Sequence, residues 1–425
     1  MRFPPRGAVA AALALSLAPS VARPAQGSGS RDEAIEALGR NDLDTAERVA
    51  RRWLEDHPAD TELTRLLGMV LVTRGMQLEA QERPRDDFMP LYSESLAVLQ
   101  KAEQLGGDRP QPGLHHAIGY LLLSHRRLAE AEQRLGLAIA EAPRSFVLYR
   151  LRGTARGELG RYPEAEEDLR RAIELDPKDM ASRLFLAHVL QLQGRNRDAA
   201  DTLRDFYERI EGEPPDERHF RALYEIAGYT LLLNDVERAR EPLEKACRLR
   251  PQDSVCRNEL GKLYHRLEEF ELAVPELEAV LADSQAPRDV RREALHYRAL
   301  IAHHDEDYPG AIRLFEASLE ISPNQSESLK ALAAALKKNG ERDQAREVLE
   351  RLRLVVEIDN EVTRLRSRLR SSPLDREARL ELAELLLRLD RRDEARVEIE
   401  TLESSSPGDP ALAELARQLG PAAKP

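Results

Sequence analysis

The amino-acid sequence predicts an all-α protein in which pairs of helices stack into an α-solenoid of about ten repeats. One residue pattern returns about every 34 residues along most of the chain. The composition agrees with this prediction: hydrophobic residues make up 42% of the chain and aromatic residues only 4%, with leucine and alanine, both strong helix formers, dominating the apolar content. We therefore expect thin core layers repeated between helix pairs rather than one thick core.

The pattern is clearest in residues 146–178, which read FVLYRLRGTARGELGRYPEAEEDLRRAIELDPK. A first helix is predicted to end at a turn residue that accepts a left-handed backbone, and a second helix to end before a proline, which cannot continue it. The expected turn residues are Gly75, Gly160, Gly194 and Asn234. The prolines are Pro58, Pro143, Pro177, Pro251, Pro323 and Pro407.

Small residues return at two positions of the repeat and a large apolar residue returns at a third. The first small position is held by Gly68, Gly119, Gly153, Ala187, Ala227, Gly261, Ala299, Ala333 and Ala383. The second is held by Ala46, Ser95, Ala131, Ala165, Ala199, Ala239, Ala273, Ala311, Ala345 and Ala395. The large position is held by Leu99, Leu135, Leu169, Leu203, Leu243, Leu277, Phe315, Leu349 and Ile399. Small side chains let two helices cross closely, and the large one is expected to fill the space beside them.

This pattern resembles that of the tetratricopeptide repeat family, over nearly the whole length expected for the mature chain. The resemblance implies a right-handed superhelix over residues 31–421 that binds its partners on the concave face. The predicted repeats are 31–58, 61–109, 112–145, 146–179, 180–213, 220–253, 254–287, 292–325, 326–359 and 376–409.

The period is interrupted by two long stretches. Residues 76–92 form an insertion, which is either a protruding binding loop or an extended turn packed on the array. A separate helix is expected over residues 360–372, and its arginines belong either to a solvated helix or to a site for an anionic ligand. They are Arg364, Arg366, Arg368 and Arg370. A last helix over 410–420 is expected to cap the open end of the solenoid.

The N-terminus has the pattern of a secretory signal peptide over residues 1–22. Arg2 and Arg6 precede an apolar stretch at 7–17, and Ser20-Val21-Ala22 supplies small residues for cleavage. A flexible linker is expected over 23–30. We expect an exported protein, periplasmic or secreted, with no membrane span in its mature part. The alternative is an uncleaved anchor.

Charge and motifs argue against several classes of function. The formal net charge is -12, which disfavours nucleic-acid binding. We find no glycine-rich phosphate loop, HExxH, nucleophile elbow or paired CxxC, and the repeats occupy almost the whole chain. A non-catalytic protein without a cofactor is therefore expected.

Cys247 and Cys256 are the two cysteines of the chain. They flank a predicted turn between two helices, which places them in one neighbourhood. In an oxidising compartment this suggests a disulfide. Two buried free thiols are the alternative.

The family resemblance implies inner-face positions on the first helix of each repeat. Over residues 254–338 these positions are rich in basic, histidine and asparagine side chains: Asn258, Lys262, His265, Arg266, His296, His303, His304, Lys330, Lys337 and Lys338. Such a groove is expected to attract an acidic segment or a free C-terminal carboxylate. The alternative is an ordinary solvated face.

The histidines of this set lie beside Asp305, Glu306 and Asp307, which leaves a metal site as a weaker alternative. If no metal binds, protonation of the histidines below about pH 6.5 offers a way to tune the groove charge. No metal site is predicted.

The predicted function is that of an exported scaffold or adaptor for protein or peptide partners. The alternatives are a structural scaffold for envelope polysaccharide export or cell-wall assembly, an accessory or regulatory subunit of a separate enzyme, and an enzyme with an unrecognised site. The sequence does not identify the partner, because repeat proteins share a frame and differ in their grooves.

Overall fold

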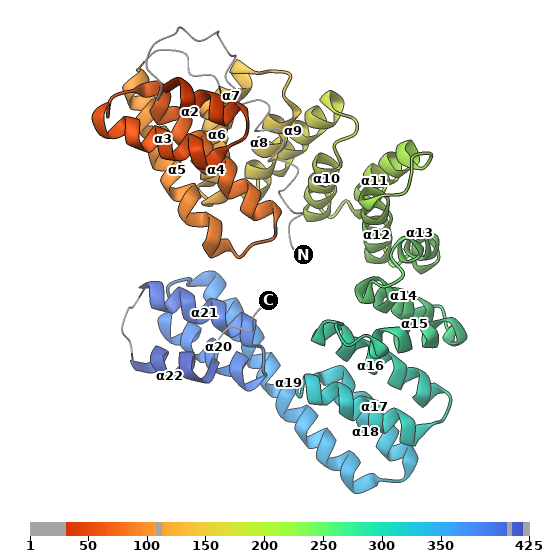
Figure 1. The fold of residues 1–425 in the computed structure, drawn as a ribbon. Helices are drawn as coiled ribbons and strands as arrows, with labels where there is room; N and C mark the ends of the chain where they lie inside the picture. Colours follow the sequence, from red (N-terminus) through yellow and green to blue (C-terminus); the bar gives the residue numbers. More distant parts are fainter. Residues whose placement is uncertain (1–30, 108–112, 406–409, 420–425) are drawn as a thin grey trace. The chain divides into compact units, whose positions relative to one another are not determined.

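The computed structural model describes residues 31–107, 113–405 and 410–419, and every regular element in these ranges is an α-helix (Figure 1). The all-α prediction is confirmed. The chain divides into two compact units, residues 31–235 and 236–419, which are described separately below. The predicted signal peptide and linker lie outside the described residues.

The first unit contains antiparallel hairpins followed by one further helix. Its helices are α2 (Arg31–Gly39), α3 (Leu43–Asp56), α4 (Thr61–Ala80), α5 (Arg85–Gly106), α6 (Leu114–Ser124), α7 (Leu128–Glu141), α8 (Phe146–Glu158), α9 (Tyr162–Leu175), α10 (Met180–Leu192), α11 (Asn196–Ile210) and α12 (Glu217–Leu232). The first helices of successive hairpins contact one another, as in α4, α6, α8 and α10. This side-by-side order is that of a solenoid.

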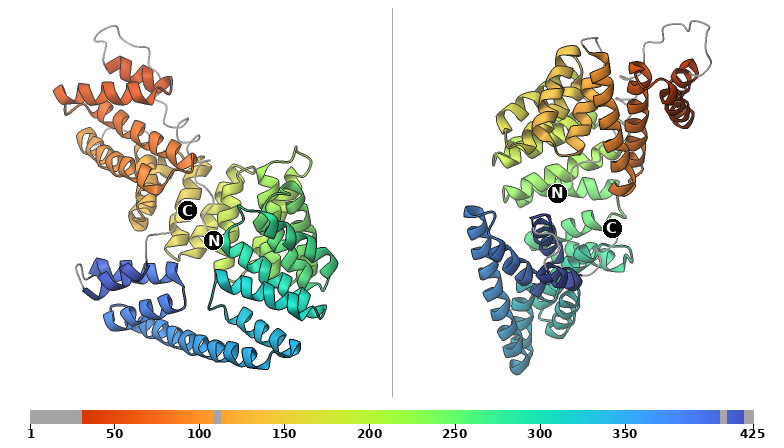
Figure 2. Two further views of the ribbon diagram at one scale, coloured as in Figure 1. Left: turned by 60° about the horizontal axis from the view of Figure 1, so that its bottom comes forward. Right: turned by 90° about the vertical axis from the view of Figure 1, so that its left-hand side faces the viewer.

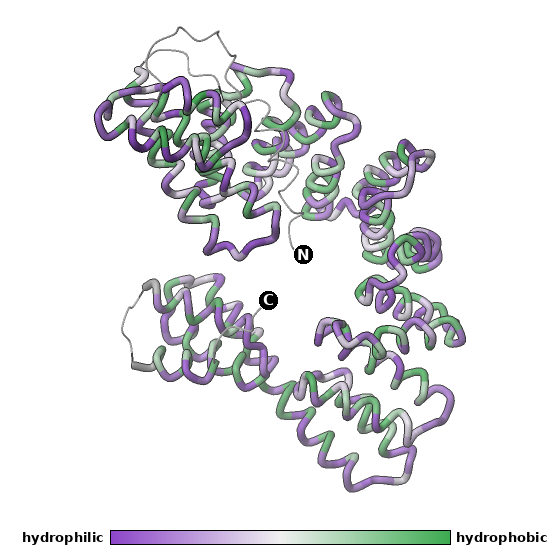
Figure 3. Tube along the Cα trace, in the orientation of Figure 1, coloured by the Kyte–Doolittle hydropathy of each residue, from purple (hydrophilic) through white to green (hydrophobic). Residues whose placement is uncertain are grey.

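The second unit repeats the arrangement. Its helices are α13 (Val236–Leu249), α14 (Ser254–Arg266), α15 (Phe270–Ala282), α16 (Arg288–His304), α17 (Tyr308–Ile321), α18 (Ser326–Asn339), α19 (Arg342–Ser371), α20 (Arg376–Arg388), α21 (Arg392–Ser405) and α22 (Pro410–Leu419). Figure 2 shows the antiparallel pairing of helices in each unit. Hydrophobic stretches recur along each helix rather than gathering in one region (Figure 3). The core is accordingly a series of thin layers.

The small and large positions of the repeat meet as the sequence predicts. A Cβ added at Gly68 would lie 2.5 Å from the side chain of Leu99, and one at Gly261 would lie 2.7 Å from Leu277. Leu99 and Leu277 are both fully buried. The absence of a side chain at the small position therefore lets the large side chain fill the gap between the two helices.

The predicted insertion at 76–92 forms neither a loop nor an extended turn. It lengthens both helices of one hairpin, so that α4 and α5 have 20 and 22 residues and the turn is confined to residues 81–84. Buried Tyr92 explains the extension: its hydroxyl group donates to Glu79 at 2.8 Å and lies 3.0 Å from that of Tyr120. Gly75 is consequently a mid-helix residue against the Tyr92 ring, not the predicted turn.

The predicted separate helix at 360–372 is also corrected, because α19 continues without a break for 30 residues. The α20–α21 hairpin is held on the C-terminal half of α19, where Asp359 pairs with Arg391 at 3.1 Å and Arg368 with Asp375 at 2.7 Å. Further ion pairs join Arg364 to Glu361 and Arg366 to Glu394. These pairs fit a solvated helix better than an anion site.

The N-terminal half of α19 keeps an apolar side in contact with solvent. Leu349 occupies the large position of its repeat but is 49% exposed, and Leu354 and Val356 are 59% and 43% exposed. The sequence prediction that Leu349 fills a gap is therefore wrong. The next hairpin docks further along α19 and does not cover this residue.

Candidate functional site

The predicted inner-face residues of the second unit come from α14, α16 and α18. These first helices of consecutive hairpins contact one another in order, so their side chains can form one continuous surface. We call this surface, defined by the ten residues predicted above, the α14–α18 face. Its charged groups differ in whether the chain already supplies a partner.

Two predicted ligand-binding residues on α14 are already engaged. The Nζ of Lys262 lies 2.8 Å from Glu259 and 3.0 Å from Glu293, and the Asn258 amide donates to Glu293 at 3.0 Å. Although burial opposes its charge, the two carboxylates raise the pKa of Lys262. Burial works against ionised Glu293 in the same way, and Lys262 nevertheless lowers its pKa. The positive charge of Lys262 is therefore neutralised within the unit.

The histidines of the α14–α18 face are packed against aromatic rings or other polar groups. His265 lies 5.2 Å from Tyr297, and His304 lies 4.5 Å from Phe270, between ring centroids. The Nδ1 of His296 is 2.8 Å from the Ser328 hydroxyl group. Burial lowers the pKa of His265 and of His296, and the neighbouring His304 and Arg292, respectively, lower it further. The surroundings therefore favour the neutral form of both imidazoles.

The histidines do not converge on a metal site. His303 packs beside Tyr308, with 5.4 Å between their ring centroids, and its buried Nε2 makes no hydrogen bond to the residues that the structure describes. Within the described ranges, no group of three or more His, Cys, Asp or Glu residues is arranged to hold a metal ion.

Three lysines of α18 remain open to solvent. Lys330, Lys337 and Lys338 are exposed, and none makes an ion pair within the described part of the chain. Lys337 and Lys338 lie in the last turn of the helix. The three lysines form the part of the α14–α18 face that makes no ion pair in the described structure, and Arg266, in the last turn of α14, is exposed as well.

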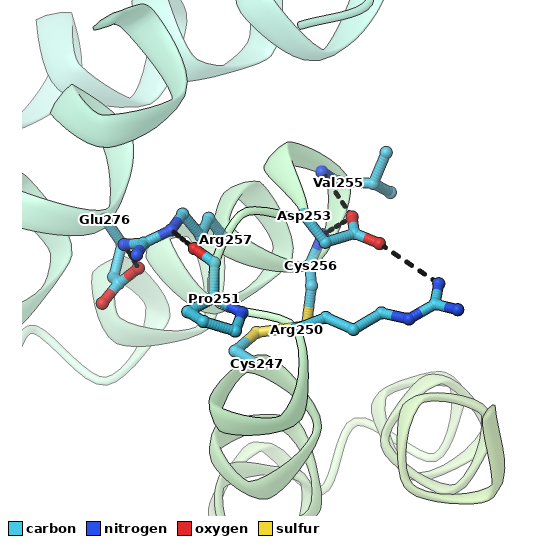
Figure 4. Close-up of a disulfide and its surroundings, with 8 residues drawn as sticks. All are labelled: Cys247, Arg250, Pro251, Asp253, Val255, Cys256, Arg257 and Glu276. Atoms are coloured by element: carbon cyan, nitrogen blue, oxygen red, sulfur yellow. Dashed lines mark hydrogen bonds and ion pairs between the residues drawn. A yellow bond between two sulfur atoms is a disulfide. The ribbon is translucent and has the colours of Figure 1, made fainter. Parts of the chain in front are cut away.

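The turn before α14 is closed by a disulfide between Cys247 and Cys256, with Cα atoms 5.6 Å apart (Figure 4). Asp253 caps α14 by accepting the backbone N–H groups of Val255 and Cys256, each at 3.0 Å. Arg250 lies 3.8 Å from the same carboxylate. The bond links α13 to the start of α14 and fixes one end of this region.

A second candidate site, in the first unit, was missed in the sequence analysis. A cavity of about 230 Å³ lies among α8, α9 and α10, and its wall includes Tyr162, Phe185 and Leu192. Glu158, the last residue of α8, also lines it. We call this cavity the Glu158 pocket. Glu158, His188 and Leu192 of its wall occupy inner-face positions of the repeats at 146–179 and 180–213, outside the stretch 254–338 in which the sequence analysis placed the binding residues.

The carboxylate of Glu158 lacks a hydrogen-bond partner. Its side chain is 7% exposed, and both oxygens are buried without a hydrogen bond in the described structure. Arg126 approaches one oxygen at 3.5 Å, but the Arg126 side chain is itself 65% exposed. A carboxylate withdrawn from water in this way is costly unless a donor reaches it.

Comparison with known proteins defines the class of protein. Two sequence models described as tetratricopeptide repeat match the chain, one over 116–179, 150–214, 186–254 and 258–326 and the other over 302–369. Together they cover more than half of the chain, and this chain belongs to the tetratricopeptide repeat family. Proteins of this family generally mediate protein–protein interactions, and their scaffold is typically non-enzymatic.

One relative matches the chain over a shorter length. The DnaJ homolog subfamily C member 3 of Rattus norvegicus is 32% identical over 102 residues, which are 24% of this chain and 20% of that protein. The chain thus matches a fifth of the length of that relative.

One of two similar solved structures, the first named below, supports the same fold. The C-terminal part of a repeat protein from Cytophaga hutchinsonii aligns with a TM-score of 0.50 and 14% identity, covering 58% of this chain and 97% of that one. A repeat protein from Parabacteroides merdae aligns with a TM-score of 0.42 and 15% identity, over 62% and 96% of the two chains. At these identities the likeness concerns the fold alone. In the described ranges, no helix is both long and apolar enough to cross a membrane.

Proposed function

We propose that this protein is an exported scaffold that holds partner proteins or peptides on the inner faces of its helical repeats. The repeat architecture supports the scaffold class. The observation that carries the choice of surface is the group of exposed lysines on α18, which make no ion pair in the described structure. They suit an acidic segment or a free C-terminal carboxylate.

The proposed export rests on the N-terminal sequence and is supported by the disulfide. Disulfides persist in oxidising compartments such as the periplasm or the extracellular space. Cys247 and Cys256 are the only cysteines of the chain, and they are joined. Mass spectrometry of the protein purified from its native source should find an N-terminus directly after Ala22 in an envelope or secreted fraction. An intact Met1 in the cytoplasmic fraction would contradict export.

The binding surface can be tested by crosslinking the full chain to its partners in the native organism. Changing Lys330, Lys337 and Lys338 together to glutamate should remove the crosslinked partner. The matched control reverses three exposed arginines of α19, namely Arg346, Arg353 and Arg364. Equal loss in both variants, or retention in both, would contradict the proposed surface.

The same crosslinking experiment distinguishes the alternative functions. A set of bound proteins favours an adaptor, glycan retained with the protein favours a scaffold for polysaccharide export or cell-wall assembly, and one enzyme bound in stoichiometric amount favours an accessory subunit. Synthetic peptides with free and amidated C-termini then test the carboxylate preference: tighter binding of the free form is expected.

A further inference from the structure

The Glu158 pocket has the chemistry of a receptor for a cation. We infer that it binds the side chain of an arginine from a partner peptide, a proposal that rests on the peptide-binding function above. It adds a cation-accepting site in the first unit to the anion-accepting lysines proposed in the second.

The charge in the pocket defines the kind of ligand. The two oxygens of Glu158 are buried and accept no hydrogen bond in the described structure, although the side chain is 7% exposed. Buried polar groups in native proteins are nearly always paired with protein, water or ligand. A cationic donor entering the pocket would supply the missing hydrogen bonds, and the low-polarity surroundings would strengthen them.

The size and lining of the pocket favour a side chain over a lone ion. The cavity of about 230 Å³ is several times the ~30 Å³ that one water occupies in the liquid. Leu169, Val189 and Leu192 provide apolar wall for an aliphatic stem, and Leu192 is 47% exposed. Long cationic side chains bury their stems on apolar surface while their charged ends stay polar.

A guanidinium group fits better than an ammonium group. Neither oxygen of Glu158 accepts a hydrogen bond in the described structure, and a guanidinium donates two parallel hydrogen bonds to a carboxylate whereas an ammonium acts as a point charge. Tyr162 and Phe185 also line the pocket, and a planar guanidinium stacks on aromatic rings. The nearby Arg126 shows that a guanidinium can approach this carboxylate. At 3.5 Å it is within ion-pair distance of one oxygen but makes no hydrogen bond to it, so Arg126 would compete with the ligand for Glu158.

The test uses the full chain and blocked tripeptides that differ in one residue. The probes are acetyl-Ala-Arg-Ala-amide, its lysine analogue and its citrulline analogue, in which a neutral urea group replaces the guanidinium. Methyl NMR signals of Leu169, Val189 and Leu192 report occupancy. We expect saturable shifts with the arginine peptide, and at least tenfold weaker binding of the other two.

Two variants assign the effect to the carboxylate. Glu158→Gln keeps the shape and should weaken arginine-peptide binding at least tenfold. Glu398→Gln is the matched control, because the Glu398 side chain is 18% exposed and is paired with Arg379 outside the pocket. Arg126→Gln should leave binding unchanged or tighten it.

Several results would overturn the inference. These are equal binding of the citrulline or lysine peptide, binding retained in folded Glu158→Gln, weaker binding in Arg126→Gln, or no shift at all, which would mean that the pocket holds only water. None of these results affects partner capture through α18, so failure here is distinct from failure of the scaffold proposal.

Discussion

Two regions with the same repeat geometry differ in whether an inner-face glutamate finds hydrogen-bond donors within the chain. Around α14 and α16, Glu293 holds both Lys262 and Asn258 at 3.0 Å, and a disulfide closes the preceding turn. Around α8 and α10, Glu158 faces a cavity and accepts no hydrogen bond in the described structure. The repeat frame therefore specifies the helix packing but not whether an inner-face charge is satisfied within the chain.

The largest expected effect tests the packing that both regions share. Leu203→Ala in α11 and Leu277→Ala in α15 should each lower local stability by about 3 kcal/mol, because both leucines are fully buried and truncation leaves a cavity. Hydrogen exchange of the surrounding amides measures each effect. Leu349→Ala is the control at the same repeat position, and since Leu349 is 49% exposed it should cost less than about 1 kcal/mol. Similar losses at all three sites would contradict the described packing of α19.

The next largest loss of stability is expected when the disulfide of the second unit is removed. Replacing Cys247 and Cys256 together by alanine should destabilise α13 and α14 by about 2 kcal/mol, because the disulfide closes a loop between residues nine apart and limits the unfolded chain. Amides of α8–α10 provide the internal control and should exchange as in the unmodified protein. Faster exchange throughout both regions would show that the two units do not unfold separately.

Replacing Glu293 and Glu158 by glutamine should change the stability of the protein in different directions. Glu293→Gln should cost about 1 kcal/mol, a value kept small because the Glu293 side chain is 33% exposed. Glu158→Gln should cost nothing and can gain up to about 1 kcal/mol, because it removes a buried charge that has no hydrogen bond. Urea unfolding of the full chain, followed by exchange at α8 and α16, measures both. A larger loss for Glu158→Gln would mean that its carboxylate is paired in solution.

The smallest effect is the pH dependence of the Glu293 contribution. Because the pKa of Glu293 is lowered in the folded state, its stabilising effect is present at neutral pH and is lost as the pH falls through that pKa. The stability difference between the unmodified protein and Glu293→Gln should therefore shrink as the pH falls below 4.5, the ordinary pKa of a glutamate. The stability difference between the unmodified protein and Lys262→Met should shrink over the same acidic pH range. A difference that stays constant with pH would contradict the ion pair.

Parts of the structure were predictable because their causes are local. Gly261 and Leu277 are 16 positions apart in one hairpin, and their small–large pairing follows from the repeat. The extension of α4 and α5 was not predictable in this way, because the prolines at 84 and 90 favoured a loop and the compensating contacts of Tyr92 come partly from Tyr120 in the next hairpin. A charge on the inner face poses the same difficulty: the partner of Lys262 is supplied by Glu293, 31 residues later.

By itself, the sequence determined the class of fold, the hairpin as the repeated unit and the residues that pack inside it, since a periodic apolar pattern is buried wherever equivalent helices meet. Only the tertiary structure decided that α19 is one helix, that Leu349 lies in solvent, that Lys262 is neutralised and that Glu158 accepts no hydrogen bond within the described ranges. These outcomes depend on how the neighbouring repeats pack and on which side chains they bring within hydrogen-bond distance, and a pattern within one repeat does not contain that information.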